Sequence, residues 1–186
     1  MHRDSVRIQT FGLNQVNSPS KYISILTGMQ EIIEPCPEND YLGEHAELIL
    51  SSHFRIMGRN LINPELSSKD RYRLLFESPF CVVSHNTDSD PVFNYGNKTA
   101  LKLFEMKWVD FIRLPSRLSA EQQAREERAK LLERVTQDGF IEDYKGIRIS
   151  SSGKRFMVED SVVWNLIDNY GSYCGQAAVI YKWSDP

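Results

Sequence analysis

Residues 80–118, FCVVSHNTDSDPVFNYGNKTALKLFEMKWVDFIRLPSRL, decide the fold because they set strands and short helices in a fixed order. The apolar, β-branched run from Phe80 to Ser84 is typical of a strand, and a cluster of turn residues from Asn86 to Pro91 follows it. A return strand is expected from Val92 to Tyr95. The stretch therefore begins with a predicted pair of antiparallel strands.

Short helices are predicted directly after the second strand. Gly96 and Asn97 interrupt the strand pattern, and the side-chain oxygen of Asn97 can accept a free N–H of a first helical turn. The apolar face of this helix is expected to come from Ala100, Leu101, Leu103 and Phe104. The segment 106–118, which contains Trp108, Phe111 and Pro115, predicts a second short helix and a loop.

Longer helical patterns lie on both sides of this stretch. Upstream, apolar residues repeat at three and four positions and predict an amphipathic helix over 40–57, ending near Gly58: Leu42, Ala46, Ile49, Leu50, Phe54 and Met57. A helical turn is expected over 70–77. Downstream, the capping-box pattern Ser119 to Gln122 predicts a helix that starts there and runs to about Gln137.

The last third of the chain predicts three strands, over 144–150, 155–167 and 172–183, separated by turn-rich tetrads that suit antiparallel hairpins. Five antiparallel strands result in all. In the middle strand, alternation places one apolar set on a single face, interrupted only by Asp160: Phe156, Val158, Val162, Trp164 and Leu166. Both faces of the predicted sheet are partly apolar, so each must be covered by another element. We expect the helices of 97–137 to cover the inner face, and the helix of 40–57 or a second subunit to cover the outer face.

Composition narrows the class of protein. The chain has 186 residues, of which 41% are hydrophobic and 25% charged, which is typical of one globular domain. The net charge is −3 and no local cluster of Lys and Arg compensates, so direct nucleic-acid binding is not expected. No apolar run approaches the roughly 20 residues of a membrane span, and the N-terminal sequence lacks the apolar middle of a signal peptide. We expect a cytoplasmic domain over 37–186, preceded by an arm of residues 1–36.

Cysteines and histidines give no metal motif. The three cysteines, Cys36, Cys81 and Cys174, form no CxxC pair and are expected to pack as free thiols. His45 and His53 lie on one predicted helix but are separated by about 12 Å of axial rise, too far to share an ion. We expect them to be surface or cap histidines.

The order of two strands, helices and three strands is that of a PAS-type domain, and the chain resembles a particular PAS-related family. It is similar to the stand-alone bacterial and algal members of the MEKHLA domain family, a module also found at the C-terminus of plant class III homeodomain leucine-zipper proteins. The matching segments span about 40–183: YLGEHAELILSS, SHNTDSDPVFNYGNKTALKLFEMKW, LPSRLSAEQQAREERAKLLERV, YKGIRISSSGKRF, VVWNLID and YCGQAAVIYKW. The literal peptide that names the family does not occur.

The resemblance implies an α+β, PAS-like fold and a sensory or regulatory domain that binds a small molecule or a protein partner, neither identified. In such folds the cavity lies between the inner sheet face and the connecting helices, and we expect it to be lined by Val83, Phe104, Trp108, Phe111, Val162, Trp164 and Ala177. The polar residues carried over from the matching segments are His85, Asn94, Tyr95, Arg117, Tyr144, Arg148, Asp160 and Gln176. Some of these residues could have structural roles instead of binding a ligand. Asp160 could form an ion pair with Arg148 or Arg155, and Asn94 and Tyr95 could connect the turn to the helix.

The same residues also suggest catalysis or cofactor binding, but less strongly. His85 with Ser84 and Asp88 could suggest a hydrolytic triad, but no GxSxG elbow is present, so catalysis by His85 or Asp160 is not expected. A PAS-type flavin photoreceptor would need a cysteine on its helix motif, and haem would need an axial histidine, for which His85 is the candidate. No cofactor is predicted. Arg117, Arg125 and Arg128 form a solvated charged face or, alternatively, an anion-binding group. The remaining alternative is a homodimerising interaction module without a ligand.

Overall fold

The computed structural model describes residues 33–122 and 125–186. The predicted arm of residues 1–36 lies outside the described residues except for its last four, so the expectation about it stays a prediction. Residues 33–186 form one compact unit.

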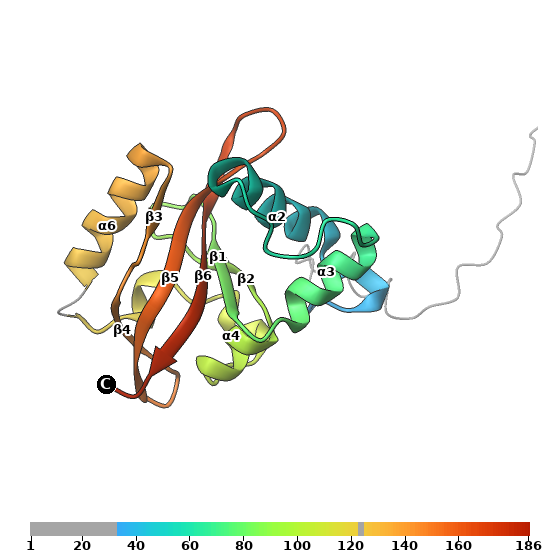
Figure 1. Ribbon diagram of the computed structural model, residues 1–186. Helices are drawn as coiled ribbons and strands as arrows, with labels where there is room; N and C mark the ends of the chain where they lie inside the picture. The colour runs from blue at the N-terminus through green and yellow to red at the C-terminus, as the bar shows by residue number, and fades with distance from the viewer. Residues whose placement is uncertain (1–32, 123–124) are drawn as a thin grey trace, which may run out of the picture. The chain divides into compact units, whose positions relative to one another are not determined.

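The core of this unit is an antiparallel sheet of six strands (Figure 1). The strands are β1 (Cys81–His85), β2 (Phe93–Gly96), β3 (Phe140–Glu142), β4 (Gly146–Ile149), β5 (Arg155–Ile167) and β6 (Tyr173–Ser184). Their order is β2-β1-β6-β5-β3, and β4 also pairs with β5. Five strands were predicted, and the additional one is β3. Its three residues follow the helix-ending Gly139 directly, and so short a run gives no usable alternation pattern.

Helices occupy both faces of the sheet. They are η1 (Pro37–Asn39), α2 (Gly43–Met57), α3 (Ser68–Glu77), α4 (Lys98–Leu103), α5 (Trp108–Phe111), η2 (Ser116–Ser119) and α6 (Arg125–Asp138). Figure 1 shows α6 at one side of the sheet and α2 with α3 at the other, and both α2 and α6 contact β5. The predicted amphipathic helix and the two short helices after the second strand are confirmed.

Asn97 caps α4 and also binds the end of α3 and the strand β1. Its Oδ1 accepts hydrogen bonds from the backbone N–H groups of Ala100 and Val82, both at 3.0 Å. Its Nδ2 donates to the Ser78 hydroxyl and to the Phe80 carbonyl, both at 2.8 Å. The side chain is completely buried, so its groups have no access to water. One amide therefore ties the end of α3 and the strand β1 to the start of α4.

The predicted capping box at Ser119 is wrong. Ser119 is the last residue of the 3-10 helix η2, and its hydroxyl donates to the Ser116 carbonyl at 2.7 Å. The described part of the following helix starts at Arg125; residues 123 and 124 lie outside the description. Pro115 gives the physical reason, because its fixed backbone angle favours a tight helical turn immediately after it.

The predicted common face of β5 is also wrong, because the pairing of β5 with β6 slips at residues 158–161. Phe156 and Val158 pack in one hydrophobic cluster with Phe104 and Phe111, on what we call the inner face. Beyond the slip, the side chains on the opposite, outer face are Val162, Trp164 and Leu166. A one-residue shift sends every later side chain to the other face, since strand side chains alternate.

The helix α2 of the same chain covers the outer face. Ala46, Ile49 and Leu50 belong to the cluster that contains Trp164. The His53 ring meets the Trp164 ring edge-on, with centroids 4.9 Å apart. His53 was expected to be a surface or cap histidine; it is buried, and its Nδ1 lies 2.9 Å from the Arg59 carbonyl just past the end of α2. The choice between this helix and a second subunit as the outer cover is thereby settled in favour of the helix.

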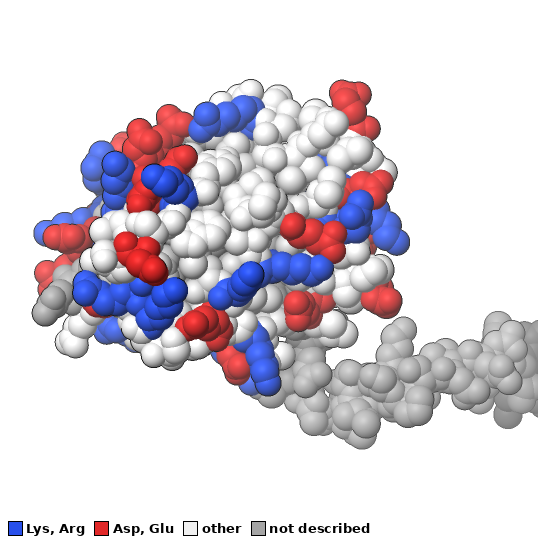
Figure 2. Space-filling view, turned by 60° about the horizontal axis from the view of Figure 1, so that its bottom comes forward, with Lys and Arg blue, Asp and Glu red and all other residues white. Residues whose placement is uncertain are grey.

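The surface carries charges of both signs. Figure 2 shows basic and acidic side chains interspersed around one face, with uncharged surface between them. Among the described residues, no helix is both long and apolar enough to cross a membrane.

Candidate ligand-binding cavity

A partly open cavity of about 60 Å³ lies between the inner sheet face and α6; we call it the inner cavity. Apolar side chains from four strands, from α6 and from Phe104 at the end of α4 make most of its wall: Val83, Phe93, Phe104, Leu131, Leu132, Val158, Val163, Ala177, Ala178 and Ile180. The polar wall consists of Ser84, His85, Ser119, Arg128, Tyr144, Arg148, Ser161 and Gln176. The composition, apolar with a few polar groups, is that of a small-molecule site.

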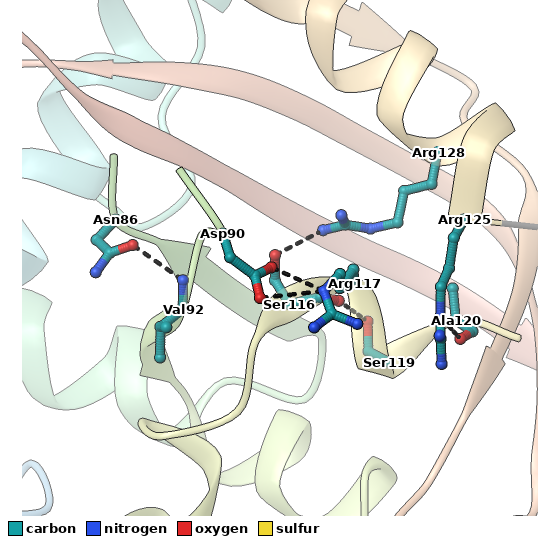
Figure 3. Close-up of polar contacts among 9 residues, drawn as sticks. All are labelled: Asn86, Asp90, Val92, Ser116, Arg117, Ser119, Ala120, Arg125 and Arg128. Carbon is teal, nitrogen blue, oxygen red and sulfur yellow. Dashed lines mark hydrogen bonds and ion pairs between the residues drawn. The ribbon is translucent and has the colours of Figure 1, made fainter. Parts of the chain in front are cut away.

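Two arginines reach this cavity. Arg148 of β4 is 9% exposed, and its guanidinium lies over the Tyr144 ring, 5.1 Å from the centroid. Its one hydrogen bond within the described residues goes to the Ile147 carbonyl, at 3.0 Å. Arg128 of α6 donates to the Ser116 hydroxyl at 3.1 Å (Figure 3). Burial lowers the pKa of Arg128 to about 10, and the charge of Arg148 acts in the same direction.

His85 and Gln176 face each other across the pairing of β1 with β6. The Nδ1 of His85 lies 2.9 Å from the Asn86 carbonyl, which fixes Nδ1 as the protonated nitrogen. Its Nε2 is buried near the Gln176 side chain and forms no hydrogen bond of regular geometry with a described group. Burial is the main cause that lowers the pKa of His85, so the ring is neutral near pH 7. Nε2 is therefore an unused acceptor at the cavity wall.

A second hollow of about 690 Å³ adjoins the inner cavity and is more open to solvent; we call it the entrance cleft. It runs along α6 and the β4 strand, and its wall includes Arg134, Lys145 and Arg155. Four side chains line both hollows: Arg128, Leu131, Tyr144 and Arg148. These four thus form the partition between the inner cavity and the outside.

The structure brings four of the predicted site residues together at the inner cavity: His85, Tyr144, Arg148 and Gln176. Three large aromatic residues from the same prediction lie elsewhere, in the cluster beneath α2: Tyr95, Trp108 and Trp164. The pairing of β1 with β2 also slips, between Ser84 and His85, and this second slip accounts for the position of Tyr95. Tyr95 stacks on His45, with ring centroids 5.6 Å apart, and burial raises the pKa of its hydroxyl.

The other predicted polar residues also lie away from the inner cavity. Asn94 accepts a hydrogen bond from the Ser84 hydroxyl at 2.6 Å, beneath α2. Asp160 is exposed and lines a shallow depression with Arg59 and Tyr181. The Asp160 ion pairs expected with arginine are not formed, since Arg155 pairs with Glu121 at 2.8 Å.

The predicted group of three arginines is divided. Figure 3 shows Arg117 directed at Asp90, with Nε 2.9 Å from a carboxylate oxygen, and Arg125 directed at the Ala120 carbonyl. Arg128 alone of the three lines the inner cavity. A ligand in the cavity would therefore meet Arg128 with Arg148, not with Arg117.

Catalytic and metal chemistry find no matching geometry. The Ser84 hydroxyl is bound to His45 Nε2 at 2.8 Å and to Asn94, whereas the His85 ring is bound to the Asn86 carbonyl, so Ser84 and His85 do not form the hydrogen-bonded pair that a triad needs. No three metal-ligating side chains converge anywhere in residues 33–122 and 125–186. His85 does face the cavity, but the cavity volume of about 60 Å³ is far below the roughly 300–1,000 Å³ of sites for drug-sized ligands. Neither haem nor flavin fits a cavity of this size.

Sequence reasoning missed the inner-face residues beyond the β5 slip, chiefly Ser161 and Val163, which line the cavity. The adjacent polar pair Glu159 and Asp160 in a long apolar strand is the signal that could have indicated a bulge. Leu131 and Leu132 of α6 were also missed as lining residues.

Comparisons with known proteins identify the family of this chain. The model of the MEKHLA domain matches residues 43–185, and the chain belongs to that family. No curated protein matches the sequence.

Solved structures show the same PAS-like fold. The PAS domain of a protein from Colwellia psychrerythraea is 13% identical with a TM-score of 0.54, and the match covers 63% of this chain and 95% of that one. An RNA-binding light-oxygen-voltage receptor is 14% identical with a TM-score of 0.54, and the match covers 66% of this chain. It covers only 34% of the receptor, so this chain corresponds to about a third of that protein.

Proposed function

We propose that the protein is a sensory or regulatory domain that binds a small molecule in the inner cavity and transmits the resulting change in shape. The observation that carries the proposal is a hollow whose wall holds the buried Nε2 of His85, which has no hydrogen-bond partner among the described residues. The same wall holds Arg148, which is 9% exposed and donates one hydrogen bond, to the Ile147 carbonyl. Buried polar groups without partners are costly, and a bound ligand would satisfy them. The helix α6 forms one wall, so its position can respond to what the cavity holds.

Native mass spectrometry of protein purified from its own host, with an absorption spectrum, tests this proposal. We expect a mass above that of the chain, lost in Val163→Phe, whose larger ring fills the cavity. Val109→Phe on the exposed side of α5 is the matched control and should keep the added mass, since Val109 is 52% exposed. An apo mass for the unaltered protein, combined with a crystal structure in which side chains fill the cavity, would overturn the proposal.

A homodimerising interaction module is the second candidate. Tyr173 and Tyr181 of β6 favour it, because each is 41% exposed and exposed aromatic side chains are enriched at interfaces. The apolar side of α2 does not support it, since that side is buried against the sheet. Light scattering separates the two candidates: a monomer at high concentration removes the second.

We propose no catalytic role and no direct contact with nucleic acid. The two residues considered for catalysis do not share a site, since His85 lines the inner cavity and Asp160 an exposed depression. A cytoplasmic location is also proposed, supported by the three cysteines, all of which are free.

A further inference from the structure

The charges at the inner cavity are unbalanced. Its wall includes the guanidinium groups of Arg128 and Arg148, whereas none of the described residues that line it is acidic. Neither arginine forms an ion pair with any described carboxylate; the exposed Arg117 and Arg155, by contrast, each have one. A charge that is removed from water without a counter-ion is costly, so the buried Arg148 beside the partly buried Arg128 requires an explanation.

We propose that the inner cavity binds a small organic carboxylate, held by Arg148 and Arg128, with its apolar part against the inner sheet face. This inference rests on the proposed function and names the class of ligand. A guanidinium presents several N–H donors in one plane, and Arg148 uses one of them within the described residues. The guanidinium carbon lies over the Tyr144 ring, 5.1 Å from its centroid, and a planar guanidinium can form two parallel hydrogen bonds to a carboxylate.

The rest of the wall decides which anions fit. Val163, Ala178 and Ile180 present an apolar floor on the inner face, which favours an anion with an aliphatic or aromatic group over a fully hydrated ion such as inorganic phosphate. His85 Nε2 accepts but does not donate, so it suits a hydroxyl or N–H on the ligand. The volume of about 60 Å³ restricts the buried part to a few atoms.

The entrance cleft, like the inner cavity, carries a surplus of positive charge. In the entrance cleft, five basic side chains (Arg128, Arg134, Lys145, Arg148, Arg155) outnumber three acidic ones (Glu121, Glu127, Asp143), a surplus of two positive charges. Such a surplus attracts anions toward the partition formed by Arg128, Leu131, Tyr144 and Arg148. A longer carboxylate could keep its carboxylate at this partition and its remaining atoms in the cleft.

Isothermal titration calorimetry on the full chain tests the inference with matched pairs of probes: butyrate against butyramide, benzoate against benzamide, and inorganic phosphate alone. We expect a carboxylate to bind and its amide to bind at least tenfold more weakly. Arg148→Met should weaken carboxylate binding by about 10–100-fold, the usual effect of removing a hydrogen bond to a charged group. Arg113→Met, which removes an exposed arginine outside both hollows, should leave binding unchanged.

The thermal unfolding midpoint of Arg148→Met shows whether the variant still folds. We expect this midpoint to be unchanged or raised, because the substitution removes an unpaired buried charge. Equal binding of amide and carboxylate, tightest binding of phosphate, or no binding of any carboxylate at millimolar concentration would overturn the inference. In each case an uncharged ligand found by native mass spectrometry would leave the proposed function standing. Loss of binding in Arg128→Met but not in Arg148→Met would contradict the role given to Arg148.

Discussion

At the scale of single residues, Asn97 and Gly175 determine how neighbouring strands and helices pack. Asn97 satisfies backbone groups of β1, of the turn after α3 and of α4 with one side chain. Gly175 lies where β6 passes β1, and a Cβ atom there would come within 2.0 Å of the His85 carbonyl oxygen. The position of His85 at the cavity wall thus depends on a residue without a side chain.

Replacing Asn97 by Ala should lower the free energy of unfolding by about 2–4 kcal/mol. The change removes a helix cap, about 1 kcal/mol, and leaves buried backbone groups such as the Val82 N–H without partners, at about 1–3 kcal/mol. Urea unfolding followed by circular dichroism measures the loss. Asn169→Ala, in an exposed turn, is the control and should change little; an equal effect of the two substitutions would contradict the role of Asn97.

Gly175→Ala should destabilise the protein more than Gly171→Ala. Both glycines have positive φ, +120° and +86°, so both substitutions strain the backbone, by about 1–2 kcal/mol. Only at Gly175 does the new Cβ meet backbone atoms, which adds the cost of displacing His85, and we expect a total of about 3 kcal/mol or more. Thermal unfolding of the two variants compares them directly. Similar losses would show that the close approach to His85 has no energetic weight.

At the scale of elements, the sequence predicted which segments form strands and helices better than which face each strand presents. The strand β5 was predicted with its observed ends, because its apolar residues and flanking turns are local signals. Its faces were not, because the slip at 158–161 depends on pairing with β6. Trp164 therefore packs on His53 beneath α2, and Val163 takes the place at the cavity that alternation alone assigned to Trp164.

The packing of α2 on the sheet should weaken as the pH falls. Burial lowers the pKa of His45 to about 4, where its ring lies against Tyr95 and bonds to Ser84. The unfolded chain binds a proton near pH 6.5 and the folded one only near pH 4, so stability is full above pH 6.5 and is lost progressively down to about pH 4.

The free energy of unfolding measured from pH 7.5 to 4.5 checks this. We expect a fall of about 1–3 kcal/mol from His45, with smaller contributions in the same direction from His53 and His85, whose pKa values are also lowered by burial. His45→Gln should reduce the slope. An identical pH dependence in the variant would contradict the role of His45.

At the scale of the whole molecule, the fold separates two functions of the sheet. The outer face is covered by α2. Between the inner face and α6 lies a hollow lined by Arg128 of α6 and Arg148 of β4, and neither pairs with a carboxylate of the described residues. Sequence reasoning placed four of ten predicted site residues at this hollow: His85, Tyr144, Arg148 and Gln176. It assigned the large aromatic residues to the wrong face, because hydrophobicity marks a buried position but not the side of the sheet.

A crystal structure of the protein purified from its own host tests the central claim most directly. We expect Trp164 against His53 on the outer face, Ser161 and Val163 facing α6, and electron density from a bound molecule beside Arg148. Trp164 turned toward α6 and filling that space, or an acidic side chain paired with Arg148, would contradict the account.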